Sequence, residues 1–348
     1  MPVSSVPVVV TGATGFIAAE VVRQLLEAGY SVRGTTRDVA TARASGELTS
    51  LPGADDRLHL MEADLLGGGL AEVVADAEYV IHVASPYALA VADPQRDLVD
   101  PAVNGTRSIL EAAARAGSTK RVVLTSSFAA IGSGSRETPY TEADWNESAS
   151  LQHSPYSYSK VRAERAAWEF MENEDPGFDL VSVNPTMVFG PTLVRRVNQS
   201  HAFFIGLTDG SAPAIVAIDH PMVDVRDVAR AHILAMESPA ATGRYLLAAG
   251  NFTPARIVDR ARRLGIDDRF RLPRLRLDRG LGVALSRAVI PFQPRGNRGF
   301  LRESLGKRWV VDGSRAERDL GLDYRDLDQT IDDTWTSLDE WGLLGRRA

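Results

Sequence analysis

The sequence predicts an α/β protein in which a doubly wound parallel sheet is followed by a smaller C-terminal lobe. Two observations lead to this prediction. The first half of the 348-residue chain alternates short β-branched runs with segments of helical period, as the strands and crossover helices of a parallel sheet do. After Pro185 this alternation loosens, and glycine, proline and arginine become frequent. The length is sufficient for one large domain with an additional lobe, or for two lobes that share a cleft.

Each element has its own signal. The run at 79–83 is continuously apolar, as expected for a strand that is buried on both faces. Gly29 and Gly117 follow two helical segments where a left-handed cap is favoured, and Pro176 breaks a third. Strands are predicted at 8–11, 31–36, 58–62, 79–83, 121–125 and 179–184, and helices at 16–28, 99–116, 156–174 and 225–236. This order is that of a Rossmann-type dinucleotide-binding domain.

The same pattern predicts the domain boundaries. We expect a flexible N-terminal arm over 1–7, the dinucleotide-binding domain over 8–190 and a mainly substrate-binding lobe over 191–348. Within that lobe, segments at about 223–250 are expected to return to the main domain, because they contain apolar runs that suit its sheet.

Composition and charge argue against several classes of protein. The net charge of 39 − 45 = −6 does not favour a nucleic-acid partner. The chain has no cysteine, which excludes disulfides and thiolate metal sites, and its six histidines are scattered, so no metal site is predicted. No apolar run approaches the roughly 20 residues of a membrane helix, and residues 1–7 lack the basic start of a secretory signal. We therefore expect a cytoplasmic protein without a membrane partner.

A glycine-rich turn lies between the first predicted strand and the first predicted helix. Gly12 permits the tight turn, and Gly15 lets the backbone approach a pyrophosphate at the helix N-terminus. The third glycine position holds Ala18, which is still small enough for close packing of helix and strand. The predicted cofactor contacts in this turn are Thr11, Gly12, Thr14, Gly15, Phe16 and Ile17.

The end of the second strand predicts which dinucleotide binds. A carboxylate there would favour NAD, but Thr36 occupies that position and Arg37 follows, where its guanidinium can bind a 2′-phosphate. Arg33 or Arg43 could assist. Arg37 could also be an ordinary solvated residue, and the nearby Asp38 could contact the ribose instead. We favour NADPH/NADP+ as the cofactor.

Two further strand ends are expected along the cofactor. Asp64 and Leu65 suit the adenine, as a carboxylate for its amine and an apolar wall, although Asp64 could equally cap a helix. The segment Val83, Ala84 and Ser85 is also predicted to contact the cofactor. His82 is interpreted as a hydrogen-bonded core histidine.

The chemistry is predicted from a serine, a tyrosine and a lysine. Ser126 and Ser127 follow the fifth strand, while Tyr156 and Lys160 are four residues apart and so share one helix face. A free tyrosine has a pKa near 10, and an adjacent ammonium favours its phenolate and lowers that pKa. A serine hydroxyl at the neighbouring strand end can hold a substrate oxygen.

These motifs resemble the extended short-chain dehydrogenase/reductases, in particular the branch of dihydroflavonol reductases, cinnamoyl-CoA reductases and yeast-type ketone and aldehyde reductases. The resemblance rests on residues 11–18, 35–38, 62–65, 82–86, 103–106, 124–127, 156–160, 184–186, 190–191, 223–229 and 309–322. It implies that Ser127 orients the carbonyl, that Tyr156 donates the proton and that Lys160 binds the nicotinamide ribose and lowers the tyrosine pKa. It further implies a water-relay role for Asn104 and cofactor contacts from Pro185, Thr186 and Val188.

The implied function is the NADPH-dependent reduction of aldehydes or ketones to alcohols. The alternatives are a nucleotide-sugar epimerase or dehydratase of the same family and a non-catalytic NADP(H)-sensing protein. Departures from the plant signatures, such as His153-Ser154-Pro155 before Tyr156, leave the small-molecule carbonyl substrate unidentified. Predicted substrate contacts are Tyr87, Phe128, Phe189, Leu193 and Phe203, and the protein is expected to be a monomer or homodimer.

One segment lies outside the resemblance. Residues 256–318 contain 16 Arg and one Lys against seven Asp plus Glu. This surplus is interpreted either as a solvated lobe paired with acidic surface or as a platform for anionic substrates.

Overall fold

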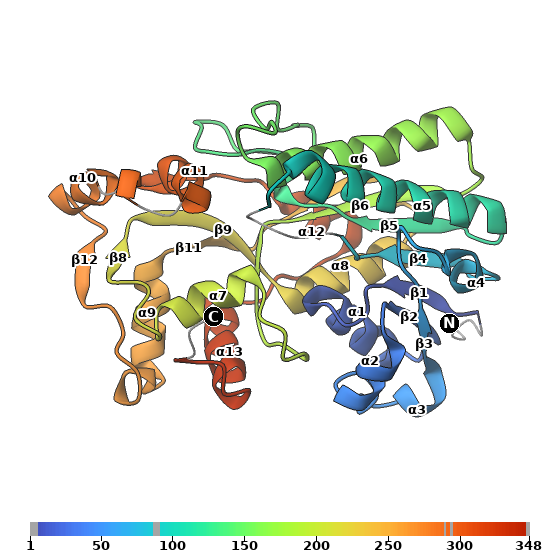
Figure 1. The fold of residues 1–348 in the computed structure, drawn as a ribbon, viewed down its shortest axis with the longest axis horizontal. Helices are drawn as coiled ribbons and strands as arrows, with labels where there is room; N and C mark the ends of the chain where they lie inside the picture. Colours follow the sequence, from blue (N-terminus) through green and yellow to red (C-terminus); the bar gives the residue numbers. More distant parts are fainter. Residues whose placement is uncertain (1–5, 86–90, 289, 293–294, 346–348) are drawn as a thin grey trace.

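The computed structural model describes residues 6–85, 91–288, 290–292 and 295–345, so most of the predicted N-terminal arm lies outside it. Its centre is a seven-stranded sheet in the order β10-β6-β5-β4-β1-β2-β3, with every neighbouring pair parallel (Figure 1). The strands are β1 (Val8–Thr11), β2 (Val32–Thr36), β3 (Leu58–Glu62), β4 (Tyr79–His82), β5 (Arg121–Thr125), β6 (Asp179–Pro185) and β10 (Gly243–Leu247). The predicted doubly wound parallel sheet is confirmed.

Helices cover both faces of this sheet (Figure 1). One face packs against α1 (Phe16–Glu27), α8 (Val225–Glu237) and α12 (Ser314–Leu320). The other packs against α4 (Leu70–Val74), α5 (Asp100–Ala116) and α6 (Pro155–Glu174). Because apolar layers cover both sides, β1 is buried along its whole length. The shorter α2 (Val39–Ser45) and α3 (Ala54–Arg57) connect β2 to β3.

The remaining elements form what we call the C-terminal lobe. Its strands are β7 (Met187–Phe189), β8 (Ala214–Val216), β9 (Ile218–Asp224), β11 (Gly250–Phe252), β12 (Leu275–Leu277) and β13 (Lys307–Arg308). Its helices are α7 (Gln199–Gly206), α9 (Pro254–Arg263), α10 (Leu281–Ala288), α11 (Arg295–Ser304) and α13 (Leu327–Glu340). An aromatic core of Phe189, Phe204, Phe252 and Trp335 holds this lobe together through edge-to-face contacts.

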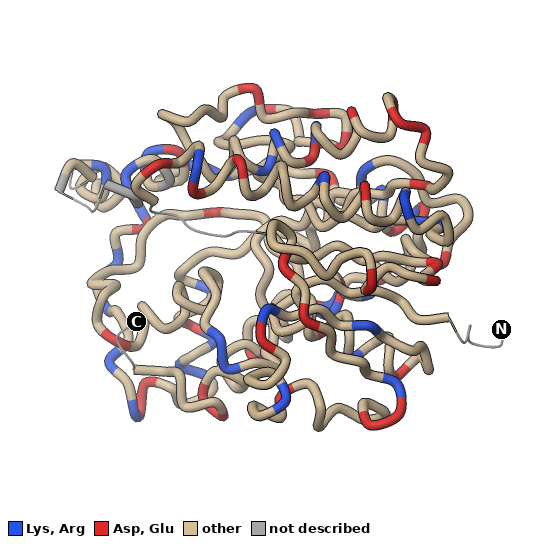
Figure 2. The backbone as a smooth tube through the Cα atoms, turned by 45° about the vertical axis from the view of Figure 1, so that its right-hand side comes forward, with Lys and Arg blue, Asp and Glu red and all other residues tan. Residues whose placement is uncertain are grey.

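Eight of the 16 arginines in the arginine-rich segment form ion pairs with carboxylates of described residues. Arg256 binds Asp328 at 2.6 Å, and Arg260 binds both Asp328 and Asp332, so that α9 and α13 are joined by ion pairs. Figure 2 shows basic and acidic residues interspersed along the backbone. This pairing agrees with the interpretation of a solvated lobe and gives no support to a platform for anions.

The described residues were also searched for membrane-spanning helices and for metal sites. None of their helices is long and apolar enough to cross a membrane. No group of three or more His, Cys, Asp or Glu side chains among them could hold a metal ion.

Candidate active site

The turn between β1 and α1 has the backbone of a pyrophosphate cradle. Gly12 adopts a φ of 65°, and a Cβ there would come within 3.0 Å of the Ala84 Cβ. Gly15 is the N-cap of α1 and has no side chain that could satisfy the first-turn N–H groups. These N–H groups and the helix dipole favour an anion at this helix end, so the turn fits a dinucleotide.

The side chain of Thr11 links this turn to the end of β4 by hydrogen bonds. Its Oγ1 accepts hydrogen bonds from the N–H groups of Val83 and Ala84, both at 3.0 Å, and lies 2.8 Å from His82 Nδ1. Since burial lowers the pKa of His82 to about 3, the ring is neutral and its Nδ1 can accept the threonine proton. The Thr11 hydroxyl therefore forms its hydrogen bonds with the end of β4 and the residues that follow it. His82 is the hydrogen-bonded core histidine that the sequence predicts.

The residues at the end of β2 that could contact a 2′-phosphate or the ribose have different surroundings. Arg37 is exposed beyond the strand, whereas the guanidinium of Arg33 donates to the Val73 and Ala75 carbonyls. These carbonyls hold the Arg33 side chain, and its assistance at the phosphate stays a prediction. Asp38 caps α2 and accepts from Thr41 N at 2.9 Å, and this contact together with the Thr41 hydroxyl lowers the Asp38 pKa.

At the end of β3, Asp64 closes a local turn. Its Oδ1 accepts from the backbone N–H of Leu66 at 2.8 Å, and its side chain is exposed. Leu65 packs close to Gly105, where a Cβ would lie 3.0 Å from the Leu65 Cδ1. The predicted adenine contacts of Asp64 and Leu65 stay a prediction.

The two serines after β5 have different surroundings. Ser127 is the N-cap of a short 3-10 turn (Phe128–Ala130) and shares a side-chain hydrogen bond with Tyr156. Ser126 is buried and donates its hydroxyl proton to Glu164 Oε2 at 2.6 Å. The hydrogen bond between Ser127 and the tyrosine supports the choice of Ser127 from the sequence.

The surroundings of Tyr156 favour its protonated form. Burial raises its pKa to about 12, and the hydrogen bond with Ser127 offsets this only in part. The sequence led us to expect a lowered pKa from the adjacent lysine, but in the structure desolvation is the dominant effect and raises it. Tyr158, two residues later on α6, accepts a 3.0 Å hydrogen bond from Arg162.

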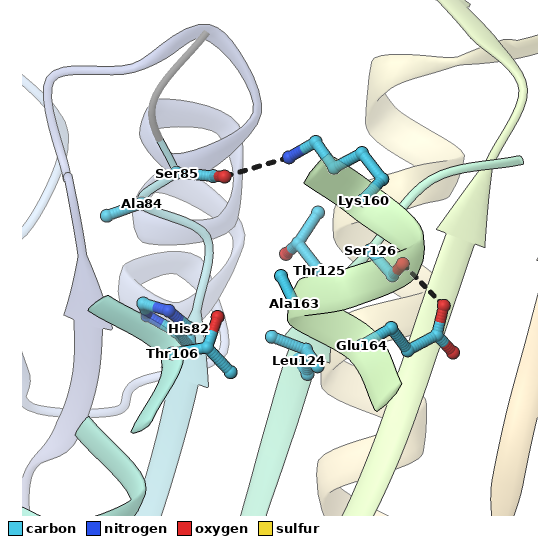
Figure 3. A pocket seen from close by; sticks show the side chains of 10 residues that line it. All are labelled: His82, Ala84, Ser85, Thr106, Leu124, Thr125, Ser126, Lys160, Ala163 and Glu164. Atoms are coloured by element: carbon cyan, nitrogen blue, oxygen red, sulfur yellow. Dashed lines mark hydrogen bonds between the residues drawn. The ribbon is translucent and has the colours of Figure 1, made fainter. Parts of the chain in front are cut away.

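Lys160 points into a small pocket between α6 and the segment that follows β4 (Figure 3). Its Nζ donates to Ser85 Oγ at 2.8 Å and lies 5.6 Å from the centroid of the Tyr156 ring. Burial lowers its pKa to about 8, while the charge of Glu164 acts in the opposite direction. The pocket is lined by His82, Ala84, Ser85, Thr106, Leu124, Thr125, Ser126, Lys160, Ala163 and Glu164.

Asn104 does not take part in this arrangement. It is exposed on α5, whereas Thr106, two residues later and on the opposite side of the helix, lines the pocket with Lys160. The water-relay role of Asn104 stays a prediction. Thr106 and Glu164 were missed in the sequence, although Glu164 lies one helical turn after Lys160.

The other predicted contacts have mixed surroundings. Phe128 is nearly buried against Tyr140 and Trp309, and Phe189 is fully buried in the lobe core. Leu193, Phe203 and Val188 are partly buried, Pro185 is buried, and Thr186 donates its hydroxyl to the Leu247 carbonyl at 2.8 Å. Tyr87 lies outside the described residues. Substrate and nicotinamide contacts from these side chains stay predictions.

Comparison with known proteins identifies the family. Residues 8–248 match the NAD dependent epimerase/dehydratase family. The ketoreductase azaE of Aspergillus niger is 36% identical over 95% of this chain and 97% of its own, and cinnamoyl-CoA reductase 1 of Arabidopsis thaliana is 34% identical over 97% and 90%. Yeast methylglyoxal/isovaleraldehyde reductase Gre2, solved with NADPH, superposes with a TM-score of 0.78 at 28% identity, covering 97% of this chain and 100% of that one. The chain thus belongs to the NAD dependent epimerase/dehydratase family, the extended short-chain dehydrogenase/reductases, and its relatives there include reductases.

Proposed function

We propose that this protein is an NADPH-dependent reductase that converts aldehydes or ketones into alcohols. The observation that carries the proposal is the contact between the Ser127 and Tyr156 side chains beside the buried ammonium of Lys160. This set brings a proton donor, a hydrogen-bonding hydroxyl and a cation to the carboxyl ends of the parallel strands, where such sheets bind their ligands.

The three residues divide the acid–base work. When bound, NADPH supplies the hydride. Tyr156 donates its hydroxyl proton to the carbonyl oxygen, which becomes the alcohol oxygen, while Ser127 donates a hydrogen bond that orients the same oxygen. The ammonium of Lys160 stabilises the tyrosinate that remains. A tyrosine whose pKa is raised to about 12 is protonated before the reaction, as a donor has to be.

The preference for NADPH is supported at the end of β2. Arg37 is exposed at the position where a 2′-phosphate is expected, and the Asp38 carboxylate is engaged by Thr41. A relative from Candida albicans, 32% identical with a TM-score of 0.77, is also solved in complex with NADPH. An arginine at this position provides charge-assisted, forked hydrogen bonds to a phosphate.

The decisive experiment follows NADPH oxidation by absorbance with aromatic aldehydes, aliphatic ketones and diketones. A reductase consumes NADPH in a 1:1 ratio to the alcohol formed. A nucleotide-sugar epimerase, which the family description admits, converts its sugar without net loss of NADPH, and a sensor binds NADPH without consuming it. Product formation without stoichiometric oxidation would reject the reductase in favour of the epimerase.

A further inference from the structure

Glu164 is a buried carboxylate one helical turn after Lys160. Its side chain is fully inaccessible to solvent, and it lines the same pocket as the lysine (Figure 3). Oε1 accepts from Arg244 Nε at 2.7 Å, and Oε2 accepts from Ser126 Oγ at 2.6 Å and Asn184 Nδ2 at 2.8 Å. Burying a charge is costly unless it is paired and hydrogen-bonded, and this carboxylate has a complete set of partners.

These partners come from three strands that meet at the active site. Ser126 is at the end of β5 and directly precedes Ser127, Asn184 is near the end of β6, and Arg244 is in β10. Asn184 Nδ2 also lies 3.3 Å from the backbone oxygen of Ser127. Glu164 therefore connects α6, which carries Tyr156 and Lys160, to the strand end that carries Ser127.

Glu164 also determines the charge around Lys160. The ionisable side chains around the ammonium are Tyr156 and Glu164 from α6 and His82 from β4. The Glu164 carboxylate is turned toward Ser126 (Figure 3), and its charge raises the pKa of Lys160. His82 is neutral because burial lowers its pKa to about 3, and Tyr156 is neutral because burial raises its pKa to about 12. Among the described residues that line the pocket, Glu164 is the sole carboxylate.

We propose that Glu164, held in place by Arg244, is a positioning residue that keeps Lys160 protonated and fixes the strand end that carries Ser127. This inference rests on the proposed reductase function. A purely structural ion pair would stabilise the fold without affecting the lysine, and the two roles differ in what they predict for the dependence of activity on pH.

The test compares Glu164→Gln with wild type in the full chain. The amide keeps the shape of the side chain but removes its charge and places an N–H where an acceptor is needed. We expect kcat to fall about 10- to 100-fold with a smaller change in KM. Because the ammonium loses its counter-charge, the fall of kcat/KM at alkaline pH should begin roughly one pH unit lower. Glu169→Gln, on the exposed side of the same helix, is the matched control and should match wild type.

Two additional variants and one spectroscopic measurement separate folding from positioning. Glu164→Asp retains the charge and should restore the alkaline limb, though not full kcat. The double variant Glu164→Gln/Arg244→Gln removes both buried charges and should regain thermal stability relative to the single variant, while kcat stays low. NMR titration of lysine labelled with ¹³C at Cε reports the Lys160 pKa without activity, and it should be lower in Glu164→Gln.

The outcomes are distinguishable. If wild type reduces no carbonyl, the proposed function fails, but the NMR titration still tests whether Glu164 acts on Lys160. If Glu164→Gln is folded and its kcat, alkaline limb and Lys160 pKa equal those of wild type, the positioning role is refuted and Glu164 is structural only.

Discussion

The charged side chains of the candidate active site and those that join α9 to α13 in the C-terminal lobe have opposite surroundings. At the carboxyl ends of β4, β5 and β6, Lys160 and Glu164 are buried with Ser126 and Asn184. In the lobe, Arg256 and Asp328 pair across α9 and α13 with more than a third of each side chain exposed. Buried charges carry a desolvation cost of several kcal/mol each, whereas exposed pairs contribute about 0–1 kcal/mol. In these two examples, the buried and therefore costly charges belong to the candidate active site, whereas the ion pair of the arginine-rich segment lies at the surface.

The largest loss of activity is expected when the proposed proton donor is removed. Tyr156→Phe deletes one hydroxyl from the buried site, and we expect kcat to fall by roughly 10²-fold or more with NADPH binding nearly unchanged. Steady-state kinetics and fluorescence titration with NADPH measure the two quantities. Tyr158→Phe, whose hydroxyl bonds to Arg162, serves as the control and should keep its turnover. The reverse result would show that the catalytic register is wrong.

The preference for NADPH over NADH tests the exposed charge of Arg37, which should contribute to cofactor binding. Arg37→Ala removes the guanidinium proposed to bind the 2′-phosphate and should raise the KM for NADPH by about 10- to 100-fold. NADH lacks that phosphate, so its KM should scarcely change. The measurement is the ratio of kcat/KM for the two cofactors. An equal loss with both, or a wild type that prefers NADH, would contradict the assignment and direct attention to Asp38.

The dependence of kcat/KM on pH tests whether the charge of the buried Lys160 is needed. Burial lowers its pKa to about 8, so the ammonium is present below that pH and is lost as the pH rises through it. We therefore expect kcat/KM to decline above about pH 8, approaching about tenfold per pH unit. Lys160→Arg keeps a charge to higher pH and should lose this limb, whatever its absolute rate. A flat wild-type profile between pH 7 and 10 would show that the lysine charge is not required.

The smallest effect is expected in the lobe. Arg256→Ala removes a half-exposed pair with Asp328 and should lower the free energy of unfolding by about 1 kcal/mol or less, with kcat unchanged. Urea denaturation and the standard activity assay measure both. A tenfold loss of kcat would overturn the view that this segment is separate from the chemistry.

The sequence predicted the parts of the site that depend on local spacing. Tyr156 and Lys160 are one helical turn apart, and the glycine turn lies between a strand and a helix, so both could be recognised from the chain alone. Thr106 could not be recognised in the same way, because the orientation of α5, which the sequence does not give, places it in the lining of the pocket.

Long-range partners were beyond the reach of sequence patterns. Arg244 donates a hydrogen bond to Glu164, which is 80 residues away in the sequence. Arg33 donates to a carbonyl that is 40 residues away. Phe189 illustrates the same limit, because an aromatic residue near a predicted site serves equally well in a core, and here it packs against Phe204 and Phe252.

The late entry of β10 into the main sheet has a consequence for how the chain folds. This edge strand can pair with β6 only after all of β7, α7, β8, β9 and α8 have been synthesised. The helix α12, which packs on the same sheet face as α1 and α8, is synthesised later still. Pairing segments so distant in sequence slows folding, since a long loop must close first. During translation the nascent sheet would therefore expose the β6 edge until Leu247 leaves the ribosome. A chain that stopped near residue 190 would keep that edge open, which is a recognised route to aggregation.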